Sequence, residues 1–147
     1  MADLVWIHEE ALRATHPVFG AARNGARAVF VWDCARFDAA FIGGKRQLFI
    51  YQTLAEMDVD IIAGQTAETL SSLLAAEDVD RLVVAETPNP AIHAALGTVR
   101  GNCPDLQIDN IAETPFVSLA APPDLGRFFR YWNKAKKGAL RHGGLPV

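Results

Sequence analysis

Residues 28–33 read Ala-Val-Phe-Val-Trp-Asp, an almost unbroken apolar run that ends on a carboxylate. A second run of this kind, Arg-Leu-Val-Val-Ala-Glu, occupies residues 81–86. A strand with one face in water alternates apolar and polar residues, whereas a strand covered on both faces is apolar almost throughout. The two runs therefore predict a parallel sheet enclosed between layers of helices.

Three more segments have a similar character, and helical patterns separate them. The predicted strands are 4–8, 28–33, 59–63, 81–86 and 106–111. The predicted helices between them are 17–24, 45–57, 66–77 and 90–100. Thr66 is a plausible cap for the third helix, and Asn89 before Pro90 is a good cap for the fourth. Alternating strands and helices predict an α/β fold, a Rossmann-like three-layer sandwich around a five-stranded parallel sheet.

The composition suits a single domain with a sizeable core. The chain has 147 residues, of which 50% are hydrophobic and 21% are charged. No apolar run approaches the roughly 20 residues of a membrane span, and the acidic start Met1-Ala2-Asp3 does not resemble a signal peptide. The two cysteines, Cys34 and Cys103, lie in no CxxC pair. We therefore expect a cytoplasmic protein whose thiols are buried or half-buried and bind no metal.

Charge is distributed unevenly along the chain. Residues 1–122 hold 8 Lys and Arg against 16 Asp and Glu, whereas residues 123–147 hold 6 against 1. An Ala-Pro-Pro hinge at 121–123 separates the acidic body, 1–120, from a predicted basic amphipathic helix at 124–141. One face of this helix carries Arg127, Arg130, Lys134, Lys137 and Arg141. The opposite face carries Leu125, Phe128, Phe129, Trp132 and Leu140, with Lys136 intruding among them.

Such a helix has several possible roles. It can contact a membrane surface, a nucleic acid or an acidic partner, or it can pack its aromatic face on the body and leave its charges in water. Binding to DNA is disfavoured because the acidic body repels phosphate.

The motifs of the common α/β enzymes are missing. There is no GxGxxG after the first strand, no phosphate-binding GxxxxGK[ST] and no GxSxG nucleophile elbow. The four histidines, His8, His16, His93 and His142, show no i, i+4 spacing for a metal pair. We therefore predict no catalytic residues. A hydrolase or lyase that uses His8 with Glu9 or Glu10 lacks a nucleophile and an oxyanion site.

A ligand-binding cleft is the best remaining candidate site. Ligands of open α/β sheets bind at the carboxyl ends of the strands, and His8 with Glu9 stands at the end of the first predicted strand. The residues predicted to line a cleft there are Trp6, His8, Glu9, Asp33, Arg46, Glu86 and Asn89. Two of these have plainer alternatives, because Trp6 lies inside a strand and Arg46 suits an ion pair with Asp33.

Several segments resemble one protein family in order along the chain. They are Leu-Val-Trp-Ile-His-Glu-Glu at 4–10 with Pro17 and Phe19, then the second strand at 25–33. The pattern Gly-x-x-Arg-x-x-Phe-Ile-x-x-Thr-Leu-x-x-Met at 43–57 is the most specific, and Phe-Phe-Arg-Tyr-Trp-Asn-Lys-Ala at 128–135 follows near the end. These segments are similar to the N-terminal domain of DNA photolyases and cryptochromes, over nearly the whole chain.

The resemblance implies a Rossmann-like domain that in the family can hold an antenna pigment of folate, deazaflavin or flavin type. The family's catalytic FAD belongs to a following helical domain without counterpart here, so neither FAD nor DNA repair is expected. The chain also departs from the family where a ligand would lie. His8 replaces an arginine, residues 10–12 replace an Asp-Leu-Arg segment, and residues 86–90 carry two prolines.

Two functions remain in competition. The first is a stand-alone photolyase-like binding or interaction module, acting as a homodimer or with a partner chain, because surface that relatives bury would be exposed. The second is a small-ligand or nucleotide-binding Rossmann-like protein.

Overall fold

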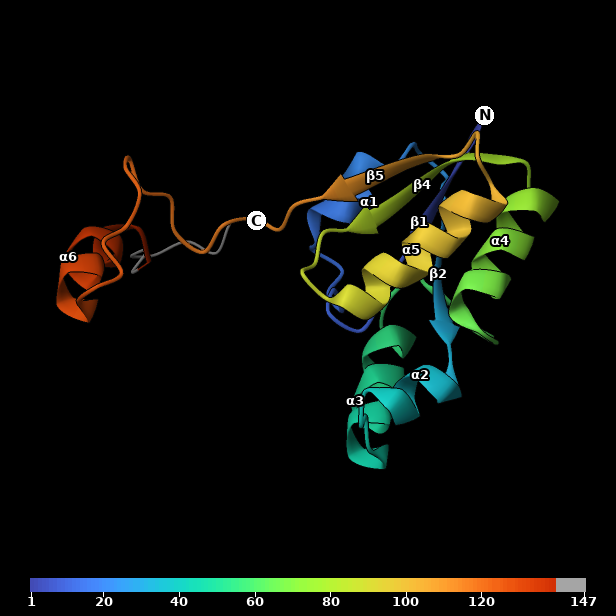
Figure 1. The fold of residues 1–147 in the computed structure, drawn as a ribbon, viewed down its shortest axis with the longest axis horizontal. Helices are drawn as coiled ribbons and strands as arrows, with labels where there is room; N and C mark the ends of the chain where they lie inside the picture. Colours follow the sequence, from blue (N-terminus) through green and yellow to red (C-terminus); the bar gives the residue numbers. More distant parts are fainter. Residues whose placement is uncertain (140–147) are drawn as a thin grey trace. The chain divides into compact units, whose positions relative to one another are not determined.

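The five predicted strands form one sheet in which all neighbouring strands run parallel (Figure 1). The computed structural model describes residues 1–139. The spatial order is β3-β2-β1-β4-β5, so β1 is the central strand. The strands are β1 (Ala2–Trp6), β2 (Arg27–Trp32), β3 (Asp60–Ala63), β4 (Val79–Ala85) and β5 (Gln107–Ile111).

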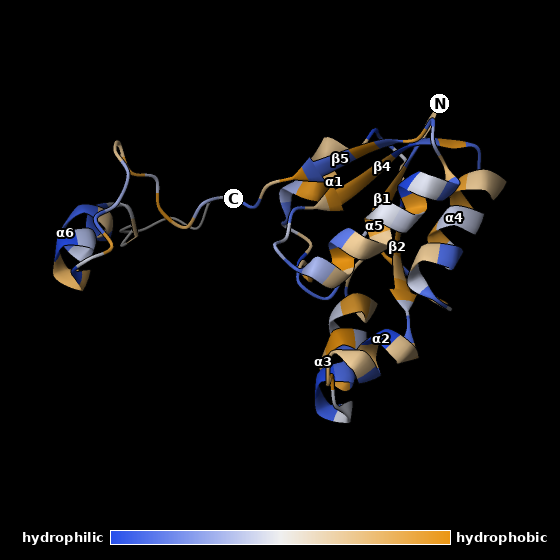
Figure 2. Ribbon diagram, viewed as in Figure 1, coloured by the Kyte–Doolittle hydropathy of each residue, from blue (hydrophilic) through white to orange (hydrophobic). Residues whose placement is uncertain are grey.

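Helices cover both faces of this sheet, which confirms the predicted Rossmann-like three-layer sandwich. They are α1 (Pro17–Ala21), α2 (Cys34–Ala39), α3 (Gly44–Ala55), α4 (Thr66–Ala76) and α5 (Pro90–Asn102). Side chains of α4 and α5 pack on one face, against Leu4 and Trp6 of β1. Side chains of α1, α2 and α3 pack on the other, against Val5 of β1. Figure 2 shows β2 and much of β4 as hydrophobic between these helices.

The element boundaries differ from the predicted ones by a few residues. The largest difference is α2, a short helix that the sequence did not predict. The cap of α4 is Gln65 and not Thr66, because the Gln65 side chain accepts the Glu68 amide at 2.7 Å. Asn89 caps α5 as predicted, through its Oδ1 and the Ala91 amide.

The two thiols lie in different surroundings. Cys103 is half-buried, but Cys34 is exposed, so the prediction of two covered thiols is wrong for Cys34. Cys34 is exposed because it is the first residue of α2, whose one buried side chain is Phe37.

The chain divides into two compact units, Met1–Glu113 and Thr114–Val147. The division precedes the predicted 121–123 hinge. Within the second unit, α6 spans Phe128–Ala139 and so begins later than the predicted start at Asp124. Leu140 and Arg141 lie outside the described residues. Within residues 1–139, no helix combines the length and the apolar content that crossing a bilayer requires.

Candidate functional site at the carboxyl edge of the sheet

The sheet reverses its winding direction between β1 and β4. The chain runs from β1 outward to β2 and β3, and then returns to the other side of β1 as β4. In open α/β sheets, the crevice at the carboxyl ends of two such strands is the usual ligand site. The loops that meet there carry His8, Glu9 and Glu10 after β1, and Glu86, Thr87 and Asn89 after β4.

His8 is buried, with 2% of its surface exposed, and both ring nitrogens have backbone partners. Its Nε2 lies 3.0 Å from the Ala85 carbonyl, and its Nδ1 accepts the Glu10 amide at 3.3 Å. A carbonyl only accepts and an amide only donates, so the ring is neutral with its proton on Nε2. Burial lowers the pKa of His8 despite the nearby charges of Glu9 and Glu10. This histidine therefore links β1 to β4.

Glu10 reaches from the β1 loop to the β4 loop. Its carboxylate accepts hydrogen bonds from the Thr87 hydroxyl and from Asn89 Nδ2, the latter at 2.8 Å. Burial alone would raise the pKa of Glu10, but these two hydrogen bonds outweigh it and lower the pKa. The ionised carboxylate thus joins the loop after β1 to the loop after β4.

Glu9 turns toward α2 and forms an ion pair with Arg36. Its Oε1 accepts from Arg36 Nε at 3.1 Å and from Nη2 at 2.7 Å, and both side chains are largely buried. Both hydrogen bonds go to Oε1, and the ion pair directs the Glu9 carboxylate toward α2.

Asp33, at the end of β2, joins two helices. It caps α2 by accepting the Arg36 amide at 3.1 Å, and it accepts both the amide and the hydroxyl of Thr66 at 2.8 Å. Burial would raise the pKa of Asp33, but the Thr66 and Arg36 hydrogen bonds outweigh it and lower the pKa. Asp33 therefore fixes the start of α4 against the start of α2.

Five of the predicted cleft residues lie at this edge, namely His8, Glu9, Asp33, Glu86 and Asn89. Trp6 is buried in the core, the plainer of its two interpretations. Arg46 is exposed on α3, and its predicted ion pair with Asp33 is absent because Thr66 and Arg36 occupy that carboxylate. The Glu86 side chain is exposed, while its amide donates to the Ile111 carbonyl.

Four residues at this edge were not among the predicted cleft residues: Glu10, Arg36, Thr66 and Thr87. The bonds Arg36–Glu9, Thr66–Asp33 and Thr87–Glu10 join residues far apart along the chain, so no local spacing signals them. The one available signal was Asp33 itself, because an aspartate three residues before an arginine in a short apolar segment suits a helix cap.

Most polar side chains at this edge form hydrogen bonds or ion pairs with other groups of the protein. Neither a general base beside a nucleophile nor a free carboxylate pair is formed by His8, Glu9, Glu10 and Asp33. Within residues 1–139, no group of three His, Cys, Asp or Glu side chains is arranged to hold a metal ion. These hydrogen bonds therefore hold together the loops that follow β1, β2 and β4.

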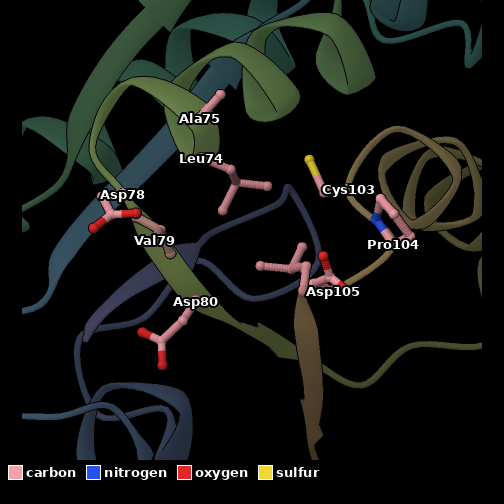
Figure 3. Close-up of a pocket in the computed structure, with 9 residues that line it drawn as sticks. Leu74, Ala75, Asp78, Val79, Asp80, Cys103, Pro104 and Asp105 are labelled. Atoms are coloured by element: carbon pink, nitrogen blue, oxygen red, sulfur yellow. The ribbon is translucent and has the colours of Figure 1, made fainter.

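A second concave region lies at the amino-terminal edge of the sheet, between the end of α4, the start of β4 and the turn before β5 (Figure 3). It encloses about 330 Å³, with Leu74, Val79 and Leu106 among its lining residues. Asp78 and Asp80 stand on the β4 side, and Asp105 stands beside Cys103 and Pro104 on the other. Asp80 is already paired with Arg23 at 3.2 Å. Both acidic and apolar side chains line this groove.

The predicted basic residues of the last helix are exposed. Arg127 directly precedes α6, and Arg130 pairs with Asp124 at 3.1 Å. Lys134 and Lys137 follow along the helix, whereas Arg141 lies outside the described residues.

Comparison with known proteins gives no family for this chain: no protein-family model matches the sequence, and no curated protein matches it.

Proposed function

We propose that this chain is a photolyase/cryptochrome-like α/β domain that works as a binding module, with a second copy of itself as its partner. We propose no DNA repair activity for this chain. It rests on the resemblance at residues 43–57 and on the surface that this same segment forms. The observation that carries it is the exposed Phe41.

Phe41 lies in the turn between α2 and α3 with φ +54°, and 94% of its surface is exposed. The left-handed backbone region disfavours side chains with a Cβ and suits glycine. The turn itself is ordinary, because the Phe41 amide donates to Asp38 and the Ile42 amide donates to Phe37. A phenylalanine here weakens the turn and gains no packing within residues 1–113. We infer that a contact outside residues 1–113 accounts for it.

Other exposed apolar side chains follow this turn in the sequence. Apart from Met1, every exposed large apolar side chain of residues 1–113 belongs to α3, to the turn before it or to β3. They are Phe41, Leu48, Phe49, Tyr51 and Ile61, which we call the α3–β3 surface. Exposed apolar groups concentrated on neighbouring elements are typical of protein interfaces.

A second copy fits this surface because β3 is an edge strand. It stands last in the order β3-β2-β1-β4-β5, so its outer edge pairs with no strand of residues 1–139. Two such edges related by a two-fold axis can pair antiparallel, and each copy then covers the other's apolar side chains.

The small-ligand alternative is less well supported. Of the six polar side chains predicted to bind a nucleotide or an antenna pigment, His8, Glu9, Asp33 and Asn89 already bind other groups of the protein. The other two, Arg46 and Glu86, are exposed. A folate, deazaflavin or flavin pigment therefore fits this edge poorly.

Light scattering on a size-exclusion column tests the proposal. Wild-type protein at micromolar concentration is expected to elute as a dimer, whereas Leu48→Glu and Phe41→Gly are expected to elute as monomers. Asn110→Glu is the matched control, because it adds the same charge at an exposed position of β5, the other edge. A monomeric wild type, or a dimer unaffected by Leu48→Glu, would reject the proposal.

An absorption spectrum of the purified protein tests the alternative. A colourless protein is expected. A band outside the ultraviolet range of the protein itself would instead support a bound pigment, and repair of ultraviolet-damaged DNA would contradict the proposal outright.

A further inference from the structure

The helix α6 has two apolar sides, and only one of them is packed. Along the first, Tyr131, Ala135 and Gly138 recur at spacings of four and three residues and turn toward the rest of the second unit. Ala135 is buried, and a Cβ placed on Gly138 would lie 2.8 Å from Val117 Cγ2. Tyr131 lines a hollow with Val117 and Leu119. This side of α6 is therefore satisfied within residues 114–139.

The second apolar side is left largely uncovered by the rest of residues 114–139, with Trp132 half-buried. Phe128 and Phe129 are 65% and 73% exposed, and Leu125 just before the helix is 80% exposed. The rings of Phe128 and Trp132 stack, with centroids 6.2 Å apart and planes within 9° of each other, and Phe129 meets Phe128 edge-on. We call Leu125, Phe128, Phe129 and Trp132 the aromatic cluster. It lies at the amino-terminal end of α6.

Cations accompany this cluster along the helix. Arg127 and Arg130 interleave with its members, and Lys134, Lys136 and Lys137 follow. Asp124 is the one acidic residue among 114–139, and it pairs with Arg130. The segment therefore joins bulky apolar groups to a net positive charge.

We propose that α6 binds the surface of an anionic phospholipid bilayer, with the aromatic cluster inserted at the level of the headgroups. An interfacial helix has a bulky apolar side, a Lys- and Arg-rich side and modest overall hydrophobicity, and α6 has all three. Aromatic rings sit well at the headgroup level, and lysine and arginine are attracted to anionic leaflets. The helix lies on the bilayer and does not cross it.

A protein groove or a nucleic acid fits these side chains less well. A helix that docks in a protein groove uses an apolar stripe along its length. In α6 that stripe is already packed, and what remains is a cluster at one end. Single-stranded nucleic acid would place bases on aromatic rings along a basic groove. Here Lys134 and Lys137 lie on the helix face opposite Phe128 and Trp132, away from the rings.

Sedimentation of the full chain with vesicles tests this inference. The protein is expected to sediment with vesicles of phosphatidylcholine and phosphatidylserine, and to be released at about 1 M salt, where screening acts within roughly 3 Å. Each cation near an anionic surface strengthens binding about fivefold, so Lys136→Gln, at the position that lies among the aromatic residues on the helix, is expected to weaken binding roughly fivefold.

The aromatic cluster has its own variant and control. Phe128→Ser with Phe129→Ser is expected to weaken binding by at least roughly tenfold, because two exposed rings no longer insert. Phe116→Ser is the matched control, since Phe116 is exposed in the same unit but outside α6. Unchanged far-ultraviolet circular dichroism shows that the variants keep their fold.

Three results would overturn the inference. The first is a wild type that stays in solution with anionic vesicles at low salt. The second is equal loss in the Phe116→Ser control and in the double phenylalanine variant. The third is tighter binding to a single-stranded oligonucleotide or to polyglutamate than to the vesicles, which would assign α6 to a nucleic acid or to an acidic protein.

Discussion

The two units treat their aromatic side chains in opposite ways. In residues 1–113, Trp6, Phe30 and Phe37 are buried between the sheet and its helices. In residues 114–139, Phe128 and Phe129 remain in solvent. The first unit thus gains its stability from its own core. The aromatic cluster of α6 adds no such core to its unit and is available for binding. A residue type therefore says little about its role until its surroundings are known.

The two units also differ in whether their charges are paired within the unit. In the first unit, the buried Asp3 accepts the Arg23 amide at 2.8 Å and Arg81 Nη1 at 2.9 Å, so an acidic group is neutralised inside the fold. In the second unit, Asp124 is the one carboxylate available to the cations of 114–139. Charge stabilises the first unit internally and remains available for binding in the second.

The largest expected effect tests whether buried and exposed aromatic residues differ in their contribution to stability. Trp6→Ala is expected to lower the free energy of unfolding by about 3–5 kcal/mol, because it leaves a cavity between β1 and the α4–α5 layer. Phe128→Ala is expected to change it by less than about 0.5 kcal/mol, because its ring is exposed. Urea unfolding followed by circular dichroism measures both. Similar losses in the two variants would contradict the assignment.

The next effect concerns the closed carboxyl edge. Asp33→Ala is expected to destabilise the protein by about 2–3 kcal/mol, since it removes the α2 cap and two hydrogen bonds from Thr66. Asp38→Ala, in the same helix but exposed, serves as the control and is expected to be nearly neutral. Urea midpoints compare the two. An Asp33→Ala variant as stable as the control would mean that the edge is open in solution and able to receive a ligand.

Acid should loosen this same edge in two stages. The folded-state pKa values of His8 and His16 are lowered by burial, so the unfolded chain takes up protons first as the pH falls below about 6.5. Stability is therefore expected to fall from pH 7 to pH 5 and to level off below the folded-state values. The lowered pKa values of Glu10 and Asp33 add a second loss as the pH falls below about 4.

The variant His8→Gln separates the first stage from the second. Its amide can still donate to the Ala85 carbonyl but does not titrate, so the urea midpoint should vary less between pH 7 and pH 5. An unaltered pH dependence in His8→Gln would assign the first stage to other groups.

The smallest expected effect is a gain. Phe41→Gly is expected to raise the stability of the monomer by up to about 1 kcal/mol, because glycine adopts the left-handed turn without strain. Leu48→Gly provides the contrast, since glycine inside α3 should cost about 1 kcal/mol. Thermal unfolding at concentrations where the protein is monomeric distinguishes them. A destabilised Phe41→Gly would show that the ring packs within its own chain.

The fold could be predicted from the sequence because its strongest signals are local. Continuous apolar runs at 28–33 and 81–86 identified the buried strands, and Asn89 before Pro90 marked the start of a helix. The hydrogen bonds of the carboxyl edge could not be predicted in this way. Glu10 binds Thr87, and Asp33 binds Thr66, across separations of 77 and 33 residues. Such contacts exist only once the strand order is known.

The basic helix was predicted in outline but not in its packing. Counting positions placed Leu125, Phe128, Phe129 and Trp132 on one apolar face, and the structure packs the neighbouring side with Tyr131 and Ala135 instead. A small residue contributes to this, because Gly138 permits a close approach of Val117 that a larger side chain would block. A pattern of hydrophobicity alone does not weigh residue size.

The central position of β1 has a consequence for synthesis. β1 leaves the ribosome well before β4, yet one of its two edges pairs with Val79–Ala85 of β4, and His8 finds the Ala85 carbonyl 77 residues later. Until β4 emerges, the nascent chain exposes an apolar strand with an open edge, a form prone to aggregation. Chaperones that hold extended apolar segments would meet this protein in that interval, and completion of β4 would end it.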